Sequence, residues 1–121
     1  MYESAENYLE TIFALSQHGK VRSIDIASEL EFSKPSVSVA MKNLREKGYA
    51  ETDSDGYITL TDSGRAIAKS MYERHMFLSD WLTYLGVDKK TAVRDACRME
   101  HAMSEKSFLA IKNHIDGWKR E

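Results

Sequence analysis

The chain has 121 residues, and 42% of them are hydrophobic, which is enough for one compact unit or two small halves that share a core. Seventeen basic and nineteen acidic residues give a net charge of −2, which disfavours a protein that binds nucleic acid nonspecifically over its whole surface. A single cysteine excludes an internal disulfide, and the sequence shows neither a signal peptide nor a membrane-spanning apolar run, so we expect a soluble cytoplasmic protein.

The first helix is expected to follow Ser4, a candidate N-cap, and to stop at Gly19. Apolar residues recur in it at helical spacing. Asn7 and Glu10 are three positions apart and are therefore neighbours on its surface. Taken alone, these two side chains are typical of an ordinary solvated helix face.

Two further helices are predicted in close succession. Ser23 opens a short helix, and Ser33 caps a third one that runs from Lys34 to Lys47 and ends at Gly48. The expected core-facing residues are Ile24, Ala27 and Leu30 in the short helix and Val37, Ala40, Met41 and Leu44 in the third. A short helix, a tight turn and a second helix form a helix-turn-helix, whose second helix enters the major groove of DNA.

The third helix carries a small, polar and basic outer face, formed by Ser36, Ser38, Lys42 and Arg45. From Ser33 to Gly48, where Lys34 adds to the basic residues, the net charge is +3, so the rest of the chain holds −5. This contrast indicates one local basic element on an otherwise acidic body, as expected for a recognition helix.

A β-hairpin is predicted directly after the recognition helix, from two β-prone runs, Tyr49–Thr52 and Tyr57–Leu60. They flank a turn that ends in Gly56. A hairpin in this place is typical of the wing of a winged helix-turn-helix. Asp53 and Asp55 at its tip repel phosphate, so no strong contact with the DNA backbone is assigned to the tip.

The second half is predicted to be helical throughout. Thr61 caps a long helix from Asp62 to about Leu85, Asp88 caps a fifth that ends near Met103, and Ser104 starts a sixth. The expected fold is mainly α with a small β-hairpin. A winged helix-turn-helix DNA-binding domain in residues 1–60 is followed by an all-helical dimerisation and metal-binding half in residues 61–121.

The helical half has more apolar surface than about sixty residues can easily bury. The residues in excess are Phe77, Trp81, Tyr84, Leu85, Phe108 and Trp118. They fit either a core shared with the winged helix or an interface between two copies. We favour a homodimer, because winged helices commonly read DNA as two-fold pairs.

One short motif carries possible chemistry: Cys97, Glu100 and His101 fall at i, i+3 and i+4 and share one helix face. The plain interpretation is a surface Glu-His pair beside a buried cysteine. Two further residues, His75 and Glu10, are also expected to face inward, although such a histidine is more often a hydrogen-bonded core residue than a ligand. Together these side chains offer the thiolate, imidazole and carboxylate ligands of a transition-metal site.

The sequence resembles the DtxR/MntR family of metal-dependent transcriptional regulators over nearly its whole length. The resemblance is carried by Ala5–Glu10, by Ser33–Ser38, by Leu60–Gly64, by Arg74-His75, and by Ala96–His101 with Met103-Ser104. It implies metal ligands at Asn7, Glu10, His75, Cys97, Glu100 and His101. It also implies recognition-helix contacts at Ser33, Pro35, Ser36, Ser38 and Val39, with the metal acting as co-repressor.

The resemblance has departures that bear on the metal. Manganese-type members usually have Asp at position 7 and Glu at position 97, whereas iron-type members have Met and Cys there. Ser79 and Val93 stand where the resemblance implies additional iron-type ligands, and we expect a short form without the SH3-like domain that many iron-type members carry. A thiolate suits Fe(II), and oxygen in its place suits Mn(II), so we favour Fe(II) with Mn(II) as the alternative.

The resulting functional prediction is a repressor that binds a two-fold operator on double-stranded DNA as a homodimer when loaded with metal, and so controls metal homeostasis genes. An alternative is a winged-helix regulator that responds to an organic ligand or to oxidation of Cys97. A metalloenzyme is disfavoured, because no base or nucleophile remains once the ligands are assigned.

Overall fold

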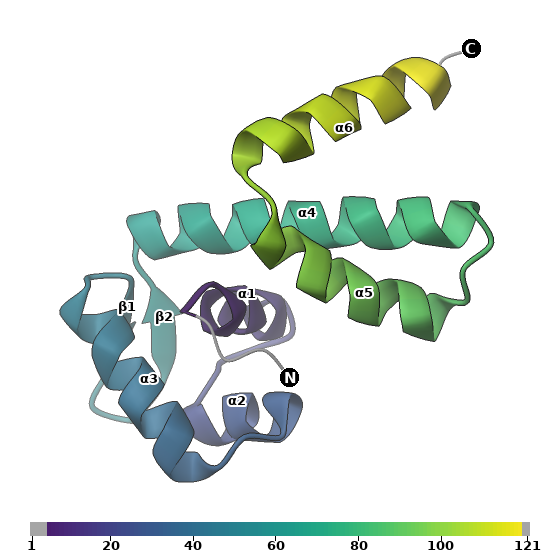
Figure 1. Ribbon diagram of the computed structural model, residues 1–121. Helices are drawn as coiled ribbons and strands as arrows, with labels where there is room; N and C mark the ends of the chain where they lie inside the picture. Colours follow the sequence, from purple (N-terminus) through teal and green to yellow (C-terminus); the bar gives the residue numbers. More distant parts are fainter. Residues whose placement is uncertain (1–4, 120–121) are drawn as a thin grey trace. The chain divides into compact units, whose positions relative to one another are not determined.

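The computed structural model describes the backbone of residues 5–119 and the side chains of residues 5–117 (Figure 1). The predicted Ser4 cap and the side chain of Trp118 lie outside the described residues. The chain divides into two compact units, residues 1–73 and 74–121, and the division falls within the long helix α4. The predicted boundary between the DNA-binding domain and the dimerisation and metal-binding half lies after residue 60. That boundary separates functions and not compact units, and it stays a prediction.

The described residues form helices and one hairpin, which confirms the predicted fold class. In chain order the elements are α1 (Ala5–Ser16), α2 (Ser23–Leu30), α3 (Lys34–Glu46), β1 (Ala50–Thr52), β2 (Ile58–Leu60), α4 (Asp62–Tyr84), α5 (Lys89–Ala102) and α6 (Glu105–Lys119). No helix in this part of the chain is long and apolar enough to cross a bilayer.

The core of the first unit is built from the inner faces of α1, α2 and α3 together with the hairpin. Its most deeply buried members include Leu9, Ile12, Ile26, Val37, Met41 and Leu44. The predicted stripe of α2 was wrong at one position, since Ile24 is 55% exposed while Ile26 is fully buried. Both isoleucines fit a helical period, and only the direction from which α2 meets its neighbours selects between them.

The hairpin pairs β1 and β2 antiparallel, with Ala50 opposite Leu60 and Thr52 opposite Ile58. An isolated bridge joins Val21, from the connection between α1 and α2, to the outer edge of β2 at Ile58. At the tip, the Asp53 carboxylate accepts hydrogen bonds from the backbone N–H groups of Asp55 and Tyr57, each at 2.9 Å. These bonds close the turn around the side chain of Asp53.

The start of α4 is anchored to the chain just before β1. The hydroxyl of Thr61 accepts from the Gly64 N–H at 3.2 Å, as predicted for a cap, and donates to the Gly48 carbonyl at 2.6 Å. The Thr61 N–H donates to the Tyr49 carbonyl at 3.0 Å. Gly64 is buried directly against this Tyr49 carbonyl, and the close approach depends on the missing side chain.

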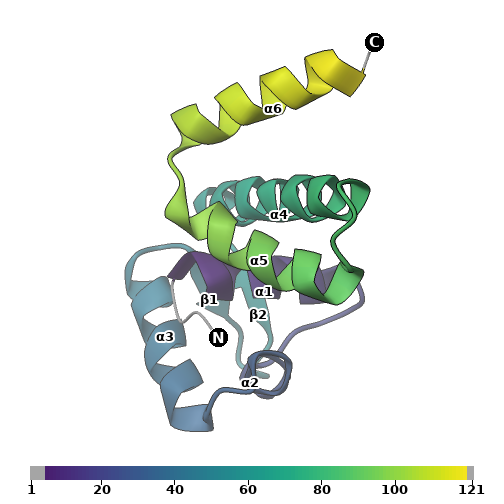
Figure 2. The same ribbon diagram turned by 45° about the vertical axis from the view of Figure 1, so that its right-hand side comes forward.

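The second unit consists of the C-terminal part of α4 with α5 and α6, and α4 lies between the other two in both views (Figures 1 and 2). Asp88 and Ser104 cap α5 and α6 as predicted, accepting from the backbone N–H groups of Thr91 and Ser107. The prediction of Phe108 as surplus apolar surface was wrong. It is 7% exposed and meets Phe77 edge to face, with ring centroids 5.6 Å apart.

Candidate metal centre and nucleic-acid interface

Three ligand-type side chains converge on one face of α5. The Cys97 thiol, a Glu100 carboxylate oxygen and an imidazole nitrogen of His101 lie within 4.8 Å of one another. The spacing i, i+3 and i+4 along the helix produces this convergence without help from other elements. The structure therefore brings together the three α5 residues that the sequence proposed as ligands.

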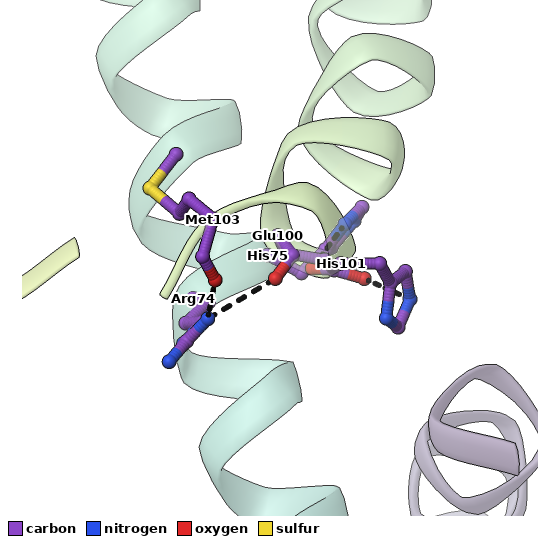
Figure 3. A network of polar contacts seen from close by, with 5 residues as sticks. All are labelled: Arg74, His75, Glu100, His101 and Met103. Atoms are coloured by element: carbon purple, nitrogen blue, oxygen red, sulfur yellow. Dashed lines mark hydrogen bonds and ion pairs between the residues drawn. The ribbon is translucent and has the colours of Figure 1, made fainter. Parts of the chain in front are cut away.

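Glu100 is the centre of the group and is completely buried. Its Oε1 lies 3.2 Å from His101 Nε2, and its Oε2 lies 3.4 Å from Nδ1 of His75, which is supplied by α4 (Figure 3). Two imidazoles from different helices thus face the two oxygens of one carboxylate. A buried carboxylate in such a place needs positive charge or hydrogen bonds close by.

Arg74, next to His75 in the sequence, supports this group from its backbone side (Figure 3). Its Nη1 donates to the Glu100 carbonyl at 3.1 Å and to the Met103 carbonyl at 3.0 Å. Its guanidinium also lies 5.1 Å from the centroid of the Phe108 ring, and the residue is 6% exposed. This role of Arg74 was not predicted from the sequence. A basic residue directly beside the candidate ligand His75 could have indicated it.

The donor set fits a divalent transition metal. One thiol sulfur, one carboxylate and two imidazoles form a borderline-soft set, of the kind that binds Fe(II), Co(II), Ni(II) or Zn(II). Asn7 and Glu10, the other two predicted ligands, are buried residues of α1 in the first unit, and their part in a metal site stays a prediction. Of the two residues at which the resemblance implied additional iron-type ligands, Ser79 is buried and Val93 is 38% exposed.

The predicted DNA-contacting residues are all exposed on α3 or at its cap. They are Ser33, Lys34, Pro35, Ser36, Ser38, Val39, Lys42 and Arg45. Val39 is 61% exposed, so its methyl groups are accessible to a partner. The Ser33 hydroxyl is already engaged, since it accepts from the Ser36 N–H at 3.3 Å and donates to Ser36 Oγ at 2.9 Å.

Two cations near the hairpin had not been singled out from the sequence. Lys20 Nζ lies 4.8 Å and Arg22 Cζ 4.3 Å from the centroid of the Tyr57 ring. Tyr57 directly precedes β2, and the two cations flank Val21. Arg22 and Tyr57 are 35 positions apart in the sequence, so their spacing gave no indication of this contact.

Family models match both parts of the chain. Residues 1–58 match the N-terminal DNA binding domain of the iron dependent repressors, and residues 61–120 match their metal binding and dimerisation domain. Together with the fold and the site, these matches define a DNA-binding transcriptional regulator, in a family whose members are repressors and not enzymes. The chain belongs to the DtxR/MntR family of metal-dependent transcriptional regulators, and its domains support DNA binding and dimer formation.

Individual relatives agree with this assignment. An HTH-type transcriptional regulator of Methanocaldococcus jannaschii is 30% identical over 122 residues, covering 98% of both chains. The transcriptional regulator MntR of Escherichia coli O157:H7 is 34% identical over 111 residues, or 91% of this chain and 72% of that protein.

A solved manganese-dependent transcriptional repressor, in complex with manganese, superimposes with a TM-score of 0.84 at 29% identity. The match covers 93% of this chain and 53% of the solved one, so this chain spans about half the length of that repressor.

Proposed function

We propose that this protein represses metal homeostasis genes by binding operator DNA as a homodimer when it is loaded with a divalent transition metal. The observation that carries the proposal is the convergence of Cys97, Glu100 and His101 within 4.8 Å, with His75 Nδ1 3.4 Å from Glu100. The same chain carries a DNA-binding domain, since residues 1–58 match the N-terminal DNA binding domain of the family.

The ligands that we propose are Asn7, Glu10, His75, Cys97, Glu100 and His101. A bound divalent cation supplies positive charge to Glu10, Cys97 and Glu100, three groups that are anionic when they act as ligands. Without it, three converging anions repel one another. Since Asn7 and Glu10 belong to the first unit and the other four residues to the second, such a set links metal occupancy to the arrangement of the DNA-binding unit.

We propose Fe(II) as the physiological metal and Mn(II) as the alternative. The thiolate of Cys97 supports Fe(II), because a soft sulfur ligand disfavours the hard Mn(II) ion. The manganese-bound repressor of similar fold supports the alternative. Both ions fit the imidazole and carboxylate ligands.

We propose that α3 enters the major groove and that two copies read a two-fold operator. Ser36, Ser38 and Val39 would meet base edges, while Lys42 and Arg45 would meet phosphates. The exposed apolar residues of the second unit, Tyr84, Leu85 and Leu109, support dimer formation through that unit. Sedimentation at micromolar concentration, with and without metal, checks this, and a monomer in both cases would refute it.

The decisive experiment is a titration of DNA selected from a random library, under reducing anaerobic conditions, with each divalent metal and with chelator. We expect tight binding only with metal. Replacing Lys42 or Arg45 with Ala should lower the slope of log affinity against log salt by roughly 0.9 for each phosphate that the variant no longer binds. DNA affinity that is unchanged by exhaustive chelation would refute metal activation. It would favour the alternative, a winged-helix regulator that responds to an organic ligand.

A further inference from the structure

The segment Lys20-Val21-Arg22 forms a short third row beside the hairpin. The Ile58 N–H donates to the Val21 carbonyl at 2.7 Å, and Val21 is 2% exposed. Side chains alternate along an extended segment, so Lys20 and Arg22 project together on the side away from the core. Both of them are exposed.

Both cations lie over the ring of Tyr57, and neither is paired with a carboxylate among the described residues. Lys20 Nζ and Arg22 Cζ lie 4.8 Å and 4.3 Å from the Tyr57 ring centroid. Within residues 5–117, neither side chain forms a salt bridge. Asp25 accepts from the backbone N–H of Arg22 at 2.9 Å and not from its guanidinium. Two like charges held over one ring repel, and an anion placed against both relieves the repulsion.

Contacts within the first unit connect the row of this cation pair to the recognition helix through the two strands of the hairpin. Arg45 of α3 donates to Thr52 Oγ1 at 3.3 Å, Thr52 pairs with Ile58, and Ile58 bridges Val21. Two strand spacings therefore separate the row of Thr52 from the row of Val21, which is about 10 Å. The major groove is about 12 Å wide, so a helix lying in it has a sugar–phosphate strand at a comparable lateral distance.

We propose that Lys20 and Arg22, held in place by Tyr57, form a phosphate-binding site for the DNA strand that borders the groove occupied by α3. The inference rests on the proposed function. The wing tip carries Asp53 and Asp55 and is unsuited to phosphate, and Asp53 is occupied with closing its own turn. The cations that contact the backbone on this side of α3 come instead from the connection between α1 and α2.

The test compares variants by fluorescence anisotropy on a labelled DNA duplex of random sequence, over a range of salt concentrations, with Mn(II)-loaded protein. The main variant is Lys20→Gln with Arg22→Gln. We expect its salt slope to fall by nearly two, about 0.9 for each phosphate bound, and its affinity at ~0.1 M salt to fall roughly eightfold for each phosphate. Lys20→Arg with Arg22→Lys keeps both charges and should retain most of the slope.

A control of equal charge is Lys89→Gln with Lys90→Gln at the start of α5, which should leave the slope unchanged. A slope unchanged in the Lys20/Arg22 variant, while Lys42→Gln lowers it, would overturn the site and leave the proposed function standing. Lower affinity with an unchanged slope, accompanied by a lower melting temperature, would also overturn it, because the cations then serve only to offset Asp53 and Asp55. Failure of the unmodified protein to bind DNA with any metal would refute the proposed function itself.

Discussion

Arg74 Nη1 donates a hydrogen bond to the carbonyl oxygen of Glu100 at 3.1 Å, and this bond joins two helices that each carry candidate metal ligands. Glu100 lies in the last turn of α5, where carbonyl groups have no donor within the helix. Arg74 supplies one, and supplies another to Met103 at the connection to α6. The last turn of α5, which carries Glu100 and His101, is thereby hydrogen-bonded to α4.

Replacing Arg74 with Met should remove both hydrogen bonds and leave the buried Glu100 carbonyl and the partly buried Met103 carbonyl without this donor, at a cost of about 1–3 kcal/mol in the free energy of unfolding. Arg74→Lys keeps the charge but not the shape of the guanidinium, so an intermediate loss is expected. Urea unfolding of metal-free protein measures this, and calorimetric titration with Mn(II) should show weakened affinity in the folded variant. Unchanged stability and unchanged affinity in Arg74→Met would show that the contacts do not support the site.

Cys97→Glu should shift activation of DNA binding from Fe(II) toward Mn(II), because a soft thiolate is exchanged for a hard oxygen while His75, Glu100 and His101 remain. The measurement is the concentration of each metal needed for half-maximal DNA binding under anaerobic, reducing conditions. His101→Ala and Glu100→Ala should instead abolish activation by both metals. If Cys97 is only a packing residue, Cys97→Ala will retain full metal-dependent binding, and that result would exclude a ligand role.

Gly64→Ala should destabilise the protein, although alanine normally favours a helix. A Cβ at this position would overlap the Tyr49 carbonyl carbon and oxygen, so the start of α4 must shift, and overpacking of this kind costs about 1–3 kcal/mol. Gly117→Ala in α6 is the matched control, because nothing lies within 4 Å of its added Cβ. That variant should be more stable by about 0.5–1 kcal/mol. Chemical unfolding of both variants checks the difference in sign.

Asp88 should make the stability of the second unit depend on pH. The backbone N–H of Thr91 donates to its carboxylate at 3.0 Å and, followed by the Thr91 side chain, lowers the pKa of Asp88 below its ordinary value of 3.8. A lowered pKa in the folded state means that the stabilisation is present above pH 3.8 and is lost as the pH falls through the folded pKa.

Asp88→Asn keeps a capping oxygen without the charge. Its deficit in urea midpoint relative to the unmodified protein should be present at pH 7, begin to shrink below pH 3.8 and disappear as the pH falls through the lowered pKa of the folded state. Asp88→Ala should show a deficit throughout this range. A deficit in Asp88→Asn that does not change with pH would contradict the role of the charge.

Much of the local structure was determined by the sequence alone. Ser33, Thr61, Asp88 and Ser104 accept from backbone N–H groups at the helix starts where they were predicted as caps. A cap depends on side chains within about three residues, so neighbours in the chain are enough to specify it. The convergence of Cys97, Glu100 and His101 has the same origin, because the period of a helix alone places i, i+3 and i+4 on one face.

Other features depended on contacts between distant segments and were decided only by the tertiary structure. The direction from which α2 packs buried Ile26 and exposed Ile24, and the packing of α6 on Phe77 buried Phe108. The bridge from Val21 to Ile58 brought two cations onto Tyr57, and the return of α5 toward α4 brought the carbonyl oxygens of Glu100 and Met103 to Arg74. In each case several arrangements satisfy the local pattern equally well, and burial of apolar side chains within each unit selects one of them.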